Sequence, residues 1–128
     1  MTDSGKAKIL VVEDEPGLLE VLALNLRASG YQAVTAADGL EALRRFEEEK
    51  PNLVTLDLNM PTISGFRLLR LFKGSDEKVP VIVITAFSYE EAEEVVRAGA
   101  DDFITKPINF DQLISKIERA LGRSAESA

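Results

Sequence analysis

The chain alternates short, continuously apolar runs with longer segments that are apolar on one side only. The runs lie near Ile9–Val12, Ala33–Ala36, Leu53–Leu56, Val81–Ile84 and Phe103–Thr105. Short apolar runs rich in β-branched residues are typical of parallel strands covered on both faces. The segments between them predict helices at about Pro16–Ala28, Leu40–Glu49, Ser64–Lys73, Tyr89–Ala98 and Asp111–Leu121. Five such units with short connections imply an α/β fold with a parallel sheet and right-handed crossovers.

Glycines and capping residues mark the ends of these elements. Gly30 and Gly99 follow the first and fourth helices, while Asp38 and Ser64 stand where the second and third begin. The second run, Gln32–Ala36, is the least apolar of the five and is expected at an edge of the sheet. The last helix has an apolar stripe that should pack on the sheet. This stripe consists of Leu113, Ile117, Ala120 and Leu121.

Length and composition indicate one globular domain, expected over residues 8–121 with short tails at 1–7 and 122–128. The 128 residues are 45% hydrophobic and 29% charged. There is no Cys and no His, which excludes disulfides, thiolate zinc sites and histidine general-base catalysis. No run approaches the roughly 18 apolar residues of a membrane span, and the first residues lack the apolar core of a signal peptide. A cytoplasmic location is expected, and the net charge of −7 argues against direct nucleic-acid binding.

Polar residues with a common chemistry stand at the ends of four strands. Glu13 and Asp14 follow the first run, and Asp57 follows the third. Open α/β sheets bind their ligands at the carboxyl ends of the strands, and three carboxylates there make a hard-oxygen pocket suited to Mg²⁺. Thr85 and Lys106 follow two further runs. Three acids, one hydroxyl and one ammonium at one edge form a site suited to handling phosphate.

Four segments together resemble the receiver domain of two-component response regulators. They are ILVVEDEP, LVTLDLNMPTISG, VPVIVITA and GADDFITKP. The resemblance runs from about Lys8 to Leu121, and the set of motifs is highly specific. It implies a flavodoxin-like, doubly wound sheet of five parallel strands in the order 2-1-3-4-5. The chain ends without an output domain after Leu121, which fits either a stand-alone receiver or part of a longer regulator.

The resemblance implies that Asp57 is the phosphoacceptor and that the reaction needs Mg²⁺. The implied metal ligands are Asp14, Asp57, the backbone carbonyl of Asn59 and, largely through water, Glu13. The charges also balance, because three carboxylates carry −3 while Mg²⁺ and Lys106 together carry +3.

The remaining site residues are implied to bind the phosphoryl group or to signal its presence. Lys106 would bind one phosphoryl oxygen, and the Thr85 hydroxyl and the Ala86 backbone N–H another. The Lys106–Pro107 bond is expected to be cis. Phe103 is implied to be a switch residue that responds to Thr85; the alternative is an ordinary core phenylalanine on the last strand. Asn59 and Phe87 would flank the path of the hydrolytic water; Phe87 would then slow dephosphorylation, or simply be a surface residue.

The implied partners are a sensor histidine kinase or phosphotransfer protein as donor, and a downstream protein. The latter would dock on the face of the fourth helix, fifth strand and fifth helix. Because the fourth helix is acidic and Asp101 and Asp102 lie nearby, two such faces should repel each other, and no tight dimer is expected on phosphorylation. The chain is expected to be a signalling protein with weak self-phosphorylation from small acyl phosphates and self-dephosphorylation, not an enzyme.

Two other classes share part of this pattern. A phosphatase of the haloacid dehalogenase type also has a strand-end aspartate, but its nucleophile normally ends the first strand and a second acid stands where this chain has Asn59. A flavodoxin-like electron carrier needs a phosphate loop after the first strand, where this chain has Glu13-Asp14-Glu15-Pro16. Taken singly, each site residue could be ordinary surface, cap or strand. Their joint occurrence favours the phosphoaccepting receiver.

Overall fold

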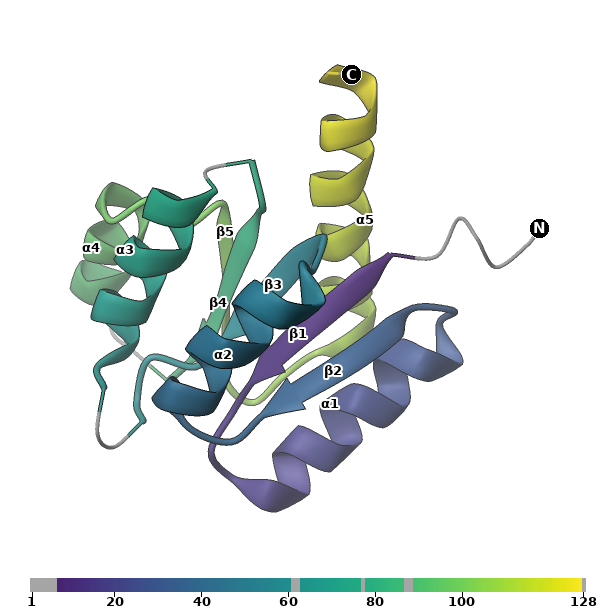
Figure 1. Ribbon diagram of the computed structural model, residues 1–128, viewed down its shortest axis with the longest axis horizontal. Helices are drawn as coiled ribbons and strands as arrows, with labels where there is room; N and C mark the ends of the chain where they lie inside the picture. The colour runs from purple at the N-terminus through teal and green to yellow at the C-terminus, as the bar shows by residue number, and fades with distance from the viewer. Residues whose placement is uncertain (1–6, 61–62, 77, 87–88, 128) are drawn as a thin grey trace.

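The computed structural model describes residues 7–60, 63–76, 78–86 and 89–127. They form a parallel sheet with helices on both faces (Figure 1). The strands are β1 (Lys8–Val12), β2 (Gln32–Ala36), β3 (Leu53–Leu56), β4 (Val81–Thr85) and β5 (Asp102–Thr105). The helices are α1 (Pro16–Ala28), α2 (Gly39–Glu49), α3 (Gly65–Ser75), α4 (Tyr89–Arg97) and α5 (Phe110–Ser127). In this described part, no helix is long and apolar enough to cross a membrane.

The strand order is β2-β1-β3-β4-β5, which confirms both the implied topology and the edge position of the second strand. All pairs are parallel, and Val12 at the end of β1 pairs with Ala36 on one side and with Leu56 on the other. Three strands therefore end at one level. The residues that follow them meet at the same edge of the sheet, where the chain reverses from one face to the other.

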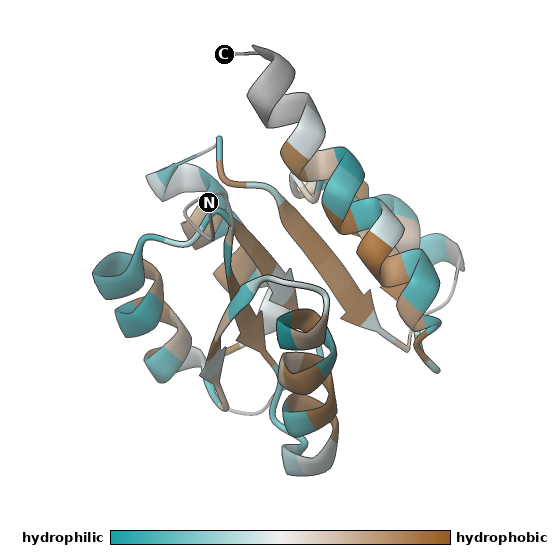
Figure 2. Ribbon diagram, turned by 90° about the vertical axis from the view of Figure 1, so that its right-hand side faces the viewer, coloured by the Kyte–Doolittle hydropathy of each residue, from teal (hydrophilic) through white to brown (hydrophobic). Residues whose placement is uncertain are grey.

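Two buried clusters lie on the two faces of the sheet. One contains Leu10 and Val12 of β1 together with side chains of α2, α3 and α4. The other contains Ile9 and Val11 with side chains of α1 and α5, including the predicted stripe of the last helix. Successive strand residues point to opposite faces, so a continuously apolar strand needs helices on both. Figure 2 shows the result, with hydrophobic strands between helices whose hydrophilic sides face outward.

The predicted helix boundaries are largely confirmed. Asp38 caps α2, where its carboxylate accepts a hydrogen bond from the backbone N–H of Glu41 at 2.8 Å. Ser64 caps α3 in the same way. Gly30 and Gly99 have φ of 98° and 105°, left-handed values that suit glycine after a helix.

The last helix is longer than the sequence indicated. The predicted end was Leu121 with a short tail after it, but α5 continues to Ser127. Gly122 lies inside this helix, and a Cβ there would meet nothing within 4 Å. A single glycine costs a helix only about 1 kcal/mol relative to alanine, so it does not stop a helix by itself. The other elements begin and end within two residues of their predicted bounds.

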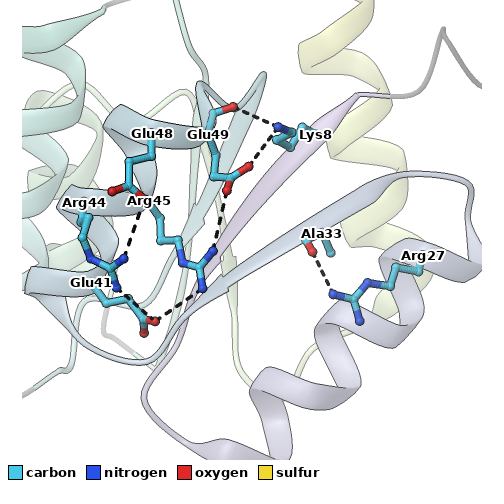
Figure 3. Close-up of polar contacts among 8 residues, drawn as sticks. All are labelled: Lys8, Arg27, Ala33, Glu41, Arg44, Arg45, Glu48 and Glu49. Atoms are coloured by element: carbon cyan, nitrogen blue, oxygen red, sulfur yellow. Dashed lines mark hydrogen bonds and ion pairs between the residues drawn. The ribbon is translucent and has the colours of Figure 1, made fainter.

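Charged side chains tie the sheet to its neighbouring helices away from the acidic edge (Figure 3). The Lys8 ammonium of β1 donates to the Glu49 carboxylate at 3.0 Å and to the Glu49 backbone carbonyl at 3.2 Å, at the end of α2. Arg45 lies 3.7 Å from the same carboxylate. On the outer edge of β2, Arg27 of α1 donates to the carbonyl of Ala33 at 2.9 Å. This bond occupies an acceptor that an exposed edge strand would otherwise offer to another chain.

Candidate functional site

Three carboxylates converge just beyond the ends of β1 and β3, as the sequence predicts. Glu13, Asp14 and Asp57 each offer an oxygen atom, and these oxygens lie within 4.8 Å of one another. The hydrogen-bond ladder of the sheet continues one residue past the strands and fixes the backbone of Glu13 and Asp57. The backbone N–H of Glu13 donates to the carbonyl of Ala36 at 3.1 Å, and the backbone N–H of Asp57 donates to the carbonyl of Val12 at 3.0 Å. Glu13 and Asp57 are only 1% and 3% exposed.

Among the described residues, Lys106 carries the only cation recorded in contact with this acidic pocket. Its ammonium lies 3.2 Å from Asp57 Oδ2 and 3.3 Å from Glu13 Oε1. The Lys106 backbone N–H donates to the carbonyl of Thr85 at 3.2 Å, which ties the end of β5 to the end of β4. The Lys106–Pro107 peptide bond is cis, as predicted.

The pocket contains more negative than positive charge. Burial, followed by the charge of Asp57, raises the pKa of Glu13 from 4.5 to about 7, although Lys106 and the Glu15 N–H act in the opposite direction. Burial lowers the pKa of Lys106, but the carboxylates of Asp57 and Glu13 outweigh it and leave that pKa above its usual value. Three carboxylates and one ammonium sum to −2. The pocket therefore favours a divalent cation or a proton.

Both oxygens of Asp57 have protein partners. Oδ2 contacts Lys106, and Oδ1 accepts a hydrogen bond from the backbone N–H of Asn59 at 3.0 Å. The chain then folds back tightly, because the N–H of Gly65 donates to the carbonyl of Leu58 at 3.2 Å. The hydrogen bond to Oδ1 holds the backbone of Asn59 beside the carboxylate. Its carbonyl is the predicted backbone ligand for a metal.

Thr85 ends β4 with a fully buried side chain, at 0% exposure. Its hydroxyl oxygen accepts a hydrogen bond from the side-chain amide of Asn59, Nδ2 to Oγ1, at 2.8 Å. The sequence placed the Asn59 carbonyl among the metal ligands and Asn59 beside the path of the hydrolytic water, but it gave no sign of this contact between residues 26 positions apart. Ala86 follows Thr85 and is exposed.

Phe103, the proposed switch residue, lies partly buried on β5 and packs against the core of α2, α3 and α4. Lys116 of α5 was not singled out from the sequence, yet its ammonium lies 5.7 Å from the centroid of the Phe103 ring. The same ammonium donates to Asp102 Oδ1 at 2.8 Å and to the Phe103 carbonyl at 3.1 Å. Phe103 is therefore linked to α5 through a cation. Phe87 lies outside the described residues.

Comparison with known proteins identifies the family to which this fold belongs. The family model described as the response regulator receiver domain matches residues 9–118. The chain belongs to the response regulator receiver family. This receiver domain is 36% identical over 122 residues to the transcriptional regulatory protein PrrA of Mycobacterium tuberculosis, covering 94% of the chain and 52% of PrrA. It is 37% identical over 123 residues to the alkaline phosphatase synthesis transcriptional regulatory protein PhoP of Bacillus subtilis, covering 94% and 51%. The chain thus spans about half the length of the curated relatives it matches.

Solved structures share the whole fold of this receiver domain. A CheY-like receiver domain protein from Methanospirillum hungatei superposes with a TM-score of 0.92 at 30% identity, covering 97% of this chain and 100% of that one. NtrX from Brucella abortus superposes with a TM-score of 0.89 at 36% identity, covering 95% of this chain and 29% of NtrX. The protein is a receiver domain of the two-component response regulators, with the fold that its sequence indicated.

Proposed function

We propose that this receiver domain accepts a phosphoryl group on the carboxylate of Asp57. The donor would be a histidine of a sensor kinase or phosphotransfer protein, or a small acyl phosphate. The observation that carries the proposal is the setting of Asp57. Its carboxylate is 3% exposed, lies at the carboxyl end of β3, contacts the Lys106 ammonium and shares a pocket with two further acids. A P–N or P–O bond of the donor would break as the new bond to Asp57 forms, and the chain would accept one group per molecule.

The donor atoms of the pocket fit Mg²⁺. Hard carboxylate and carbonyl oxygens are the ligands that this ion prefers, and here they would come from Asp14, Asp57 and the backbone of Asn59, with Glu13 acting largely through water. The ion's charge of +2 would balance the pocket's formal charge of −2. When bound, Mg²⁺ would offset the negative charge on the phosphoryl oxygens.

Three groups of the chain would hold the transferred phosphoryl group. The Lys106 ammonium would move from its carboxylate partners to a phosphoryl oxygen, which keeps its charge paired. The Thr85 hydroxyl and the Ala86 backbone N–H would bind a further oxygen. Such fixed donors stabilise the charge that is spread over the equatorial oxygens during transfer.

The phosphorylated state would be read by a protein partner at the surface of α4, β5 and α5. Phe103 lies on β5 in this surface, and its ring packs next to the core while contacting Lys116 of α5. Thr85 of β4 and Phe103 of β5 would be the switch. The two strands are neighbours, and Phe103 pairs with Val83, two residues before Thr85 on β4. The exposed acids of α4 support a partner with a basic or mixed surface.

Intact mass spectrometry after mixing the protein with acetyl phosphate and Mg²⁺ tests the proposal. We expect one added phosphoryl group per chain, lost on standing and absent when the metal is chelated. Asp57→Asn keeps the shape of the side chain but removes the nucleophile, so this variant should fold and gain no mass. Asp14→Ala should weaken Mg²⁺ binding and phosphorylation together. Quantitative phosphorylation of Asp57→Asn at another residue would refute the assignment.

A further inference from the structure

Asn59 contacts two residues of the proposed site with two different groups. Its backbone N–H donates to Asp57 Oδ1 at 3.0 Å, and its side-chain amide donates to Thr85 Oγ1 at 2.8 Å. We propose that the Asn59 side chain is a positioning group that orients the Thr85 hydroxyl, so that the hydroxyl hydrogen is reserved for a phosphoryl oxygen on Asp57. This inference rests on the proposed function and deepens it.

The Thr85 hydroxyl and the Asn59 amide differ in the hydrogen bonds that they can make. A threonine hydroxyl has one hydrogen to donate and two lone pairs to accept, whereas an amide NH₂ group can only donate. Toward Asn59, the Thr85 hydroxyl is therefore an acceptor, and its hydrogen remains to be donated. Among the residues that the structure describes, no acceptor is recorded for that hydrogen.

Burial makes this unused donor significant. The Thr85 side chain is 0% exposed, and buried donors in folded proteins nearly always have an acceptor. The hydroxyl lies at the end of β4. Asn59 contacts this hydroxyl through its side-chain amide and contacts Asp57 through its backbone N–H. An oxygen carried by Asp57 would supply the missing acceptor. A donor oriented before the ligand arrives need not reorganise when it binds, which is the usual advantage of a preorganised site.

The test uses beryllofluoride with Mg²⁺ as the phosphoryl mimic, with its affinity measured by fluorine NMR. Asn59→Ala frees the hydroxyl to rotate and should weaken binding about fivefold, the factor that one neutral hydrogen bond represents. Asn59→Asp places an acceptor where the amide donates, so it should take up the hydroxyl hydrogen and weaken binding further. Asn52→Ala, at the opposite end of β3, is the matched control and should leave the affinity unchanged.

Thr85→Val distinguishes orientation from direct contact. The valine variant has no hydroxyl to orient, so adding Asn59→Ala to it should produce no further loss of affinity. If Asn59 acted on the phosphoryl mimic or on the metal directly, the same loss would appear in both backgrounds, and the inference would be overturned. Tighter binding by Asn59→Ala would also overturn it, because Asn59 would then be holding Thr85 back.

The wild-type protein and Asp57→Asn separate this inference from the function beneath it. Wild-type binding that is lost in Asp57→Asn supports the proposed function whatever Asn59 does. With that result in hand, an Asn59→Ala variant of unchanged affinity would refute the inference alone. Absence of binding by the wild-type protein would overturn both.

Discussion

Glu13 is a carboxylate in a place that does not favour its charge. It is 1% exposed and lies beside Asp57, and these two causes raise its pKa from 4.5 to about 7. Between pH 4.5 and about pH 7, Glu13 holds a proton in the folded protein and releases it in the unfolded chain. Raising the pH across this range therefore lowers the stability of the metal-free protein, by as much as about 3 kcal/mol from this residue alone.

The first prediction concerns the proton on Glu13. Because a metal ion in the pocket favours the ionised carboxylate, Mg²⁺ binding should release a proton below about pH 7 and become tighter as the pH rises through this range. Calorimetry in two buffers of different ionisation enthalpy measures the number of protons released. Glu13→Gln cannot release one, so the buffer dependence should disappear in that variant. Equal proton release by the variant and the wild-type protein would show that another group titrates.

A second residue-scale prediction concerns Thr55 in the middle of β3. Its side chain is 1% exposed, and its hydroxyl has no hydrogen-bond partner among the described residues. Thr55→Val keeps the shape and removes the unpaired hydroxyl, so it should increase the free energy of unfolding by about 1 kcal/mol. Urea unfolding of the two proteins at one pH provides the measurement. A loss of stability in the variant would mean that the hydroxyl is paired, for example with water.

At the scale of elements, the connection from β3 to α3 carries the proposed phosphoacceptor and the residue that contacts both it and Thr85. Asp57 and Asn59 lie on it, and α3 begins at Gly65 directly against the chain that leaves β3. A Cβ on Gly65 would lie 2.2 Å from Leu58 Cα, far closer than two carbon atoms can approach. Glycine at this position is therefore required by the close approach of the backbone.

The third prediction compares two glycines of α3. Gly65→Ala should push Leu58 away and destabilise the protein by about 3 kcal/mol, and it should weaken Mg²⁺ binding because Asn59 moves with the connection. Gly74 is the matched control, since a Cβ there meets nothing within 4 Å. Gly74→Ala should be neutral or stabilising by up to about 1 kcal/mol. Equal effects on the unfolding midpoint would mean that helix propensity, rather than the contact with Leu58, decides both.

At the scale of the whole molecule, charge is unevenly distributed over the proposed output surface. The acids of α4 are all exposed, namely Glu90, Glu91, Glu93 and Glu94. Arg97 at the end of the helix lies 3.8 Å from Glu93 and so offsets only part of this charge. On α5, Lys116 is paired with Asp102 within the same molecule. Two copies of this surface would therefore bring mainly acidic groups together.

The fourth prediction follows from this repulsion. Beryllofluoride and Mg²⁺ should not produce a tight dimer through α4, β5 and α5, and any association should be weaker at low salt, where charges are screened least. Sedimentation velocity with and without the mimic measures the oligomeric state. Glu93→Lys combined with Glu94→Lys reverses the local charge and should permit association if repulsion is the cause. An activated wild-type dimer whose interface maps to α4 would contradict the prediction.

Much of the fold could be predicted from the sequence because local chemistry determines it. A strand covered on both faces must be apolar throughout, so the runs in β1, β3 and β4 were recognisable, and the caps Asp38 and Ser64 begin their helices as predicted. The acids and Lys106 could be placed at one edge because each lies within two residues of the end of a strand. The end of α5 was missed, since one glycine is a weak signal and nothing packs against Gly122 to decide where the helix ends.

The contacts that decide how the site works depend on distances between segments far apart in the chain. The Asn59–Thr85 hydrogen bond, the approach of Gly65 to Leu58 and the position of Lys116 beside Phe103 leave no periodic pattern in the sequence. Each depends on how two elements pack to within a fraction of an ångström, which the whole core determines. The sequence alone therefore determined which residues reach the edge of the sheet, because strand periodicity and strand ends are local properties. Only the tertiary structure decided which of them touch, because hydrogen bonds require atomic distances that no local property specifies.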